Sequence, residues 1–109
     1  MSAALFVAQR LSAVVLALAV TVHLGTVLYA VRGGLTAGEV LGRTQGNIWF
    51  LGFYTTFVLA VAVHAPIGLR NIFREWTHWR GTTLDLAMIG VAFALLGLGL
   101  RAVIAVFIA

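Results

Sequence analysis

Long stretches without a formal charge most limit how this chain can fold. Twenty-one uncharged residues separate Arg10 from Arg32, an apolar run extends from Ile48 to Leu69, and the chain from Leu86 to Ala109 is apolar except for Arg101. About 20 residues of helix cross the hydrocarbon core of a bilayer. Strands would leave backbone groups unpaired in lipid. The pattern therefore predicts an all-α membrane protein with three transmembrane helices in an up-down-up bundle.

The composition favours the same fold class, because 62% of the residues are hydrophobic and only 9% are charged. A soluble domain has about a quarter of its residues charged. We expect a single transmembrane domain over residues 1–109, with spans at about 10–31, 48–70 and 84–108. The first span is too long for the apolar region of a signal peptide and lacks a small-residue cleavage site after it, so we expect it to be retained.

Two loops should connect the spans. The loop Arg32–Asn47 is rich in glycine and is expected to be a mobile connector. The loop Asn71–Thr83 is polar, carries two Trp and is expected to be an interfacial turn. With the N-terminus inside, the inner side carries four Arg and the outer side three, which slightly favours a cytoplasmic N-terminus. The expected location is the inner (cytoplasmic) membrane, as a multi-pass protein.

The cysteine count and the distribution of charge limit which functions we expect of the chain. The chain has no Cys, which excludes disulfides, thiolate metal sites, iron–sulfur clusters and covalently attached haem within it. The net charge is +4, but the seven basic residues, all Arg, are scattered and form no patch. We therefore do not expect nucleic-acid binding.

Two histidines, His23 and His64, lie inside predicted spans. Ionisable residues at membrane depth are costly and are usually functional. A lone membrane histidine is as often an interhelical hydrogen-bonding residue as a ligand. Two of them, with no acidic residue at similar depth, favour neutral imidazoles that ligate a metal or haem over a proton relay.

The residues around His64 fit an edge-on macrocycle. Ala60 and Gly68 lie one turn before and after it on the same helical face. Phe53 and Phe57 precede them on that face and could pack against an apolar rim, while Asn71 and Arg74 could meet propionates at the interface. Helix–helix packing also selects small residues. Pro66 should bend this helix.

Other small residues are expected to form helix-packing seams. One stripe, in the first span, is Ala13, Ala17, Thr21 and Gly25, and another, in the third span, is Gly90, Ala94 and Gly97. His23 has Ala19 one turn before it but Val27 one turn after, so its surroundings look tighter. The histidines also differ in depth, at roughly 9 Å for His64 and 20 Å for His23 from the inner edge, so they are not expected to share an iron.

Two motifs resemble a known family. Gln9-Arg10-Leu11-Ser12-Ala13 is similar to His-Arg-[Val/Ile]-Ser-Gly, and His64-Ala65-Pro66-Ile67-Gly68-Leu69-Arg70 is similar to His-x-x-x-Gly-[Ile/Leu]-Arg. Both occur in the cytochrome b membrane-anchor subunits of succinate dehydrogenases and fumarate reductases. The order and spacing of the motifs and the number of spans also match, so the resemblance covers most of the chain.

The resemblance implies that His64 is an axial ligand of haem b. It places Arg10 near haem propionates and a quinone pocket, with Ser12 and Glu75 as polar neighbours of the quinone. The His23-Leu24 pair is similar to the di-haem branch of the family, where the first span also carries a ligand. The chain departs from the family at three positions, Phe6 for Ser, Gln9 for His and Asn71 for His.

The expected function is that of a haem b-binding anchor, a non-catalytic subunit that passes electrons between an iron–sulfur subunit and quinone. A flavoprotein would complete the complex. One or two haems would be shared with a second membrane-anchor subunit or a second copy of this chain. The alternatives are a haem b subunit of another membrane oxidoreductase and a cofactor-free membrane scaffold or small transporter component.

Overall fold

The computed structural model describes residues 2–109 and contains four helices and no strand among them. Three helices are long: α1 (Ala3–Gly33), α3 (Ile48–Trp76) and α4 (Thr82–Ile108). They contain 31, 29 and 27 residues and are long and apolar enough to cross a membrane. At 1.5 Å per residue each exceeds the roughly 30 Å hydrocarbon core. A short helix, α2 (Ala37–Thr44), lies between α1 and α3.

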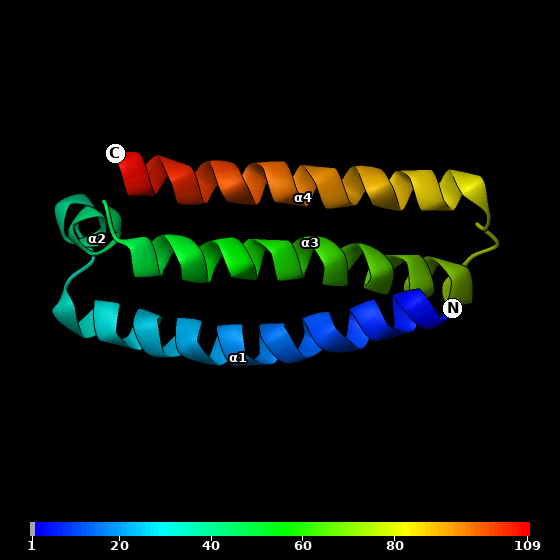
Figure 1. Ribbon diagram of the computed structural model, residues 1–109, viewed down its shortest axis with the longest axis horizontal. Coiled ribbons are helices and arrows are strands. Elements are labelled where there is room, and N and C mark those ends of the chain that lie inside the picture. The colour runs from blue at the N-terminus through cyan, green and yellow to red at the C-terminus, as the bar shows by residue number, and fades with distance from the viewer. Residues whose placement is uncertain (1) are drawn as a thin grey trace.

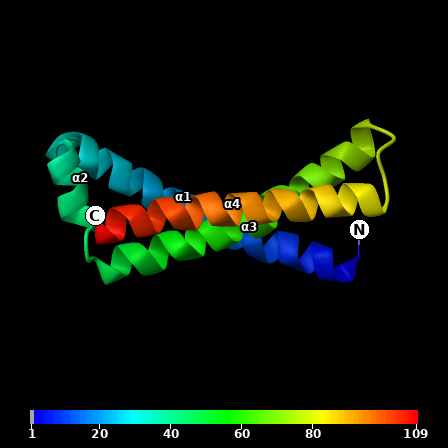
Figure 2. The ribbon, with the colours of Figure 1, turned by 90° about the horizontal axis from the view of Figure 1, so that it is seen from above.

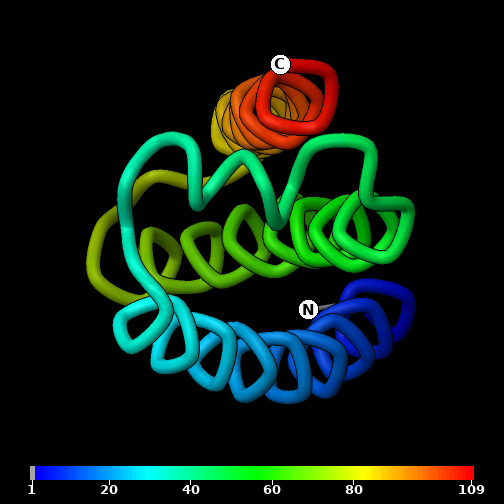
Figure 3. Tube along the Cα trace, turned by 90° about the vertical axis from the view of Figure 1, so that its left-hand side faces the viewer, coloured from blue at the N-terminus to red at the C-terminus, as the bar shows by residue number. Residues whose placement is uncertain are grey.

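The long helices form an open row with α3 in the middle. Both α1 and α4 pack against α3, and they make little contact with each other. Figure 1 shows the row from the side and Figure 3 from one end. Seen from above, α1 and α3 cross each other (Figure 2). The N-terminus lies at the end where α3 connects to α4, whereas α2 and the C-terminus lie at the opposite end (Figure 1).

Little of the protein is buried, as expected for helices that face lipid. Only seven hydrophobic residues are buried in the described chain, among them Leu84, which is fully buried. Large apolar side chains cover the outside, and Leu18 of α1 and Leu98 of α4 are each 67% exposed. Such a surface is stable in hydrocarbon and would aggregate in water.

A close helix contact lies between α3 and α4 at Gly99. A β-carbon at this position would lie 2.6 Å from Cγ1 of Val58. Glycine therefore lets the two backbones approach. On either side of Gly99, α4 buries Leu84, Met88 and Val103, so the contact extends along most of the helix.

The connection between α1 and α3 differs from the expected mobile connector, because it contains α2. Thr36 caps this helix by accepting from the Glu39 N–H at 3.3 Å, and its hydroxyl donates to the Glu39 carboxylate at 2.7 Å. At the other end of α2, the Thr44 hydroxyl donates to the Val106 carbonyl, and the Gly46 N–H donates to the Phe107 carbonyl. These bonds tie the connection to the last turn of α4 and satisfy carbonyls that a helix end leaves free.

The second loop is shorter than predicted. The helix α3 continues through Asn71 to Trp76, so only residues 77–81 separate it from α4. Pro66 lies within α3, which continues through it as one helix.

Candidate functional site

His64 lies where α3 packs against α1. Its Nδ1 is 3.3 Å from the hydroxyl oxygen of Ser12, a residue that is only 7% exposed. The same hydroxyl is 3.1 Å from the carbonyl oxygen of Gln9, one turn earlier on α1. A polar chain therefore runs from the α1 backbone through Ser12 to the imidazole.

The Ser12 hydroxyl favours one tautomer of His64. A serine hydroxyl carries a single hydrogen, and the Gln9 carbonyl can only accept. When the Ser12 hydroxyl donates to Gln9, its oxygen is left to accept from a His64 Nδ1–H. In a neutral imidazole the proton on Nδ1 leaves Nε2 with its lone pair. This is the tautomer that a metal-ligating histidine adopts when a neighbouring acceptor orients it.

His23 also meets α3, but in different surroundings. Its Nδ1 is 2.9 Å from the hydroxyl of Tyr54, and its ring packs edge-on against Tyr54 and Phe57. Phe53 packs on both of those rings. Tyr54 can either donate or accept, so the contact leaves the tautomer of His23 open. The two phenylalanines expected beside a haem at His64 thus belong to an aromatic cluster around His23 and Tyr54.

The two histidines are far apart along the bundle. His23 contacts Tyr54, which precedes His64 by ten residues on the same helix. Ten residues of helix correspond to about 15 Å. Two axial ligands of one haem lie at nearly the same depth in a helical bundle, so this separation agrees with the expectation that His23 and His64 of one chain do not share an iron.

The small residues flanking His64 face other parts of the chain. Ala60 is buried at 8% exposure, and a β-carbon added to Gly68 would lie 3.5 Å from Nε2 of Gln9. The Gln9 side chain of α1 therefore occupies the space beside Gly68. Within a single chain the imidazole of His64 is present, but the space beside Gly68 is filled by α1.

The residues expected around a quinone are not brought together. Ser12 is buried against His64, whereas Arg10 is exposed and its guanidinium lies over the Phe6 ring, 5.8 Å from the centroid. Glu75 lines a polar cavity of about 380 Å³ beside the second loop. The other residues that line it are Asn71, Arg74 and Arg80. The expected propionate contacts, Asn71 and Arg74, thus share a site with Glu75.

The two stripes of small residues expected to be packing seams point elsewhere. Ala17, Thr21 and Gly25 are exposed on α1, as are Gly90, Ala94 and Gly97 on α4. These stripes therefore form no helix contact within this chain. On α1 the buried positions are Ser12 and Ala19, because the polar contacts of Ser12 and His23 fix which face meets α3.

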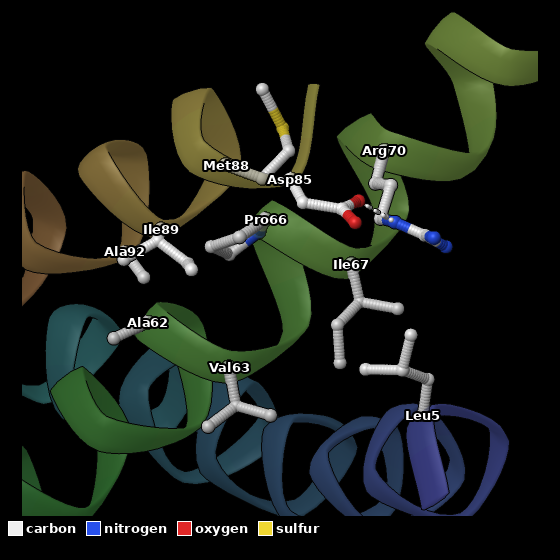
Figure 4. Close-up of a pocket in the computed structure, with 10 residues that line it drawn as sticks. All are labelled: Leu5, Ala62, Val63, Pro66, Ile67, Arg70, Asp85, Met88, Ile89 and Ala92. Carbon is white, nitrogen blue, oxygen red and sulfur yellow. Dashed lines mark hydrogen bonds and ion pairs between the residues drawn. The ribbon is translucent and has the colours of Figure 1, made fainter. Parts of the chain in front are cut away.

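A second polar feature, not expected from the sequence, lies between α3 and α4. Arg70 Nε is 2.8 Å from the Asp85 carboxylate, in the first turn of α4. The pair lines a cavity of about 330 Å³ whose other eight lining residues are apolar. Figure 4 shows the ion pair at one end of this lining and Ala62 and Ala92 at the other. Asp85, just inside the predicted third span, could have indicated this ion pair from the sequence, since a carboxylate at that depth needs a partner.

No family model, curated protein or solved structure matches the chain. Within residues 2–109 no group of three or more His, Cys, Asp or Glu side chains could hold a metal ion. Neither of the two cavities described above is lined by His64 or His23.

Proposed function

We propose that the chain is a haem b-binding membrane anchor that passes electrons between the iron–sulfur subunit of a succinate dehydrogenase or fumarate reductase-type complex and quinone. The observation that carries the haem assignment is the chain of hydrogen bonds from Gln9 through Ser12 to His64. With the proton on Nδ1, Nε2 of this imidazole would keep its lone pair and could act as a ligand atom. The resemblance of the two motifs supplies the type of complex.

The residues fit the ligand role, but they do not fit a complete haem site within one chain. His64 would hold the iron through Nε2, and Ser12 would orient the ring through Nδ1. The bound haem would supply one-electron transfer. Gln9 beside Gly68 leaves no enclosing pocket in the single chain, and His23 is too far away to be the second ligand.

The missing ligand and enclosure therefore come from a second membrane subunit or a second copy of this chain. The exposed stripes Ala17–Gly25 and Gly90–Gly97 are small enough for a further helix to approach closely. His23 would be the ligand of a second haem in a homodimer and a structural residue in a hetero-pair. A hetero-pair is favoured slightly, because it is the commoner arrangement for three-span anchors of the family that the chain resembles.

The proposed membrane arrangement is an up-down-up crossing of the inner (cytoplasmic) membrane with a cytoplasmic N-terminus. The end that carries the N-terminus also carries Arg70, Arg74, Arg80 and the second loop. This end carries the greater number of Arg residues, and cytoplasmic ends are enriched in them. The iron–sulfur and flavoprotein subunits would dock here, where Trp76 and Trp79 add aromatic surface.

The visible spectrum of the purified protein tests the proposal. The wild-type protein should show a six-coordinate, low-spin b-type spectrum, and His64→Ala should remove it, or half of it if two haems are bound. His78→Ala, in the loop, is the matched control and should leave the spectrum unchanged. A haem content that is the same in both variants would contradict the assignment.

A second candidate function is a cofactor-free scaffold. It is favoured by the fact that each membrane histidine already has a hydrogen-bond partner on the neighbouring helix. A purified protein without visible absorbance would support this candidate. If haem is present, the co-purifying subunits separate the proposed complex from another membrane oxidoreductase with a haem b subunit.

A further inference from the structure

The cavity between α3 and α4 is polar at one end and apolar along the rest, as a site for an amphiphile would be. It runs from Ala62 to Arg70 along α3, eight residues or roughly 12 Å. Its end near the second loop carries Arg70 and Asp85, and the rest is apolar. Leu5 of α1 also lines it, so all three long helices contribute. A ligand here would place its polar end towards the membrane surface and its apolar body towards the membrane interior.

The charges at the polar end select a neutral ligand. The Nε of Arg70 pairs with Asp85, which balances the charge of the guanidinium. Nη1 of Arg70 is buried and has no hydrogen-bond partner among residues 2–109. A buried N–H group without an acceptor is costly. What this end lacks is therefore an acceptor oxygen, such as a carbonyl, rather than a second negative charge.

The size of the cavity limits the occupant further. At about 330 Å³ it is at the small end of the range of ligand pockets. It can take a single substituted ring with the start of one tail, and its charge-balanced polar end offers no excess positive charge to a phosphate.

We propose that this cavity holds the ring of a quinone, with one carbonyl oxygen accepting from Arg70, and that the quinone site is here and not beside Arg10. The assignment rests on the proposed function for the identity of the ligand class. It departs from the resemblance, which implies a site at Arg10. That residue is exposed and stacks on Phe6, and it lines neither of the two cavities.

A photoreactive azidoquinone with a short alkyl tail tests the assignment on the full chain, extracted in mild detergent with any subunits that accompany it. After illumination, peptide mass spectrometry should find the label on 62–70 or 85–92. The same quinone without the azide should compete, and phosphatidylglycerol should not. Competition by phosphatidylglycerol alone would identify a lipid site and overturn the proposal.

Two sets of variants sharpen the test. Ala92→Phe fills the apolar end and should lower labelling about tenfold or more, whereas Ala102→Phe places the same side chain at an exposed position of α4 outside the cavity and should not. The double variant Arg70→Met/Asp85→Leu removes the ion pair without leaving either charge unpaired. It should also weaken labelling about tenfold. A loss of labelling in Arg10→Met, with none in the double variant, would overturn the assignment.

The visible spectrum of the same samples separates this proposal from the proposed function. A sample with haem but with the label outside the cavity would refute the quinone site and leave haem ligation standing. Labelling of the cavity in a sample without haem would support the site and count against haem ligation.

Discussion

Replacing Ser12 with alanine isolates what its hydroxyl does for His64. The variant leaves the imidazole in place but removes the acceptor of its Nδ1–H. An interhelical hydrogen bond in a membrane protein contributes about 0.6 kcal/mol on average and at most about 1.7 kcal/mol. At 3.3 Å, the Ser12–His64 contact is slightly longer than the usual N–H···O range, whereas Ser12 is almost fully buried. We therefore expect a loss of about 1 kcal/mol, or about fivefold in haem affinity.

The chain provides a matched control for this variant. The Thr56 hydroxyl also donates to a carbonyl of its own helix, that of Gly52, at 2.9 Å, but Thr56 is exposed. Haem titrated into the apoprotein, followed by its Soret absorbance, should bind more weakly to Ser12→Ala and equally well to Thr56→Ala. Equal affinities in both variants would refute the role assigned to Ser12 and, with it, the argument for the tautomer.

Three further predictions concern packing, orientation and assembly. Gly99→Leu should destabilise the protein by more than 1 kcal/mol in detergent unfolding, because its β-carbon meets Val58, whereas Gly52→Leu has open space and should be nearly neutral. Because the chain has no Cys, single cysteines report orientation. A membrane-impermeant thiol reagent should label His78→Cys only in inside-out vesicles and Gly38→Cys only in right-side-out vesicles, and the reverse pattern would contradict the proposed orientation. The haem content and subunit composition of a mild detergent extract should show more than one membrane chain per haem site, and a monodisperse monomer that retains a bis-histidine haem would contradict the need for a partner.

The sequence was sufficient to predict that the chain is helical, with three helices long and apolar enough to cross a membrane. Hydropathy over about 20 residues is a strong pattern, because a bilayer excludes charge along a whole span. The helix α2 was not predicted, because the glycines around it suggested a flexible connector. The pair Thr36 and Glu39 was the better indicator, since Ser or Thr followed three residues later by Glu is typical of a helix start.

The faces of the helices were harder to predict than the helices themselves. Because α1 is apolar all round, its hydrophobic pattern gives no packing direction, and small residues alone do not reveal which partner they meet. The face of α1 that packs against α3 is set by two polar pairs, Ser12 with His64 and His23 with Tyr54. The members of each pair are far apart in the sequence. The cavity at Arg70 was missed for a similar reason, because its shape depends on how α4 lies against α3.

The open row of helices has a consequence for biogenesis. Since α1 is made first and packs mainly against α3, it would enter the bilayer without a packed neighbour from its own chain. Ser12 and His64 are 52 residues apart. At the usual 5–20 residues per second, about 3–10 s of translation separate them. During that interval the Gln9 carbonyl can hold the Ser12 hydroxyl within α1. The imidazole finds its orienting acceptor only when α3 arrives, so we expect haem insertion to follow the insertion of the second span rather than to accompany that of the first.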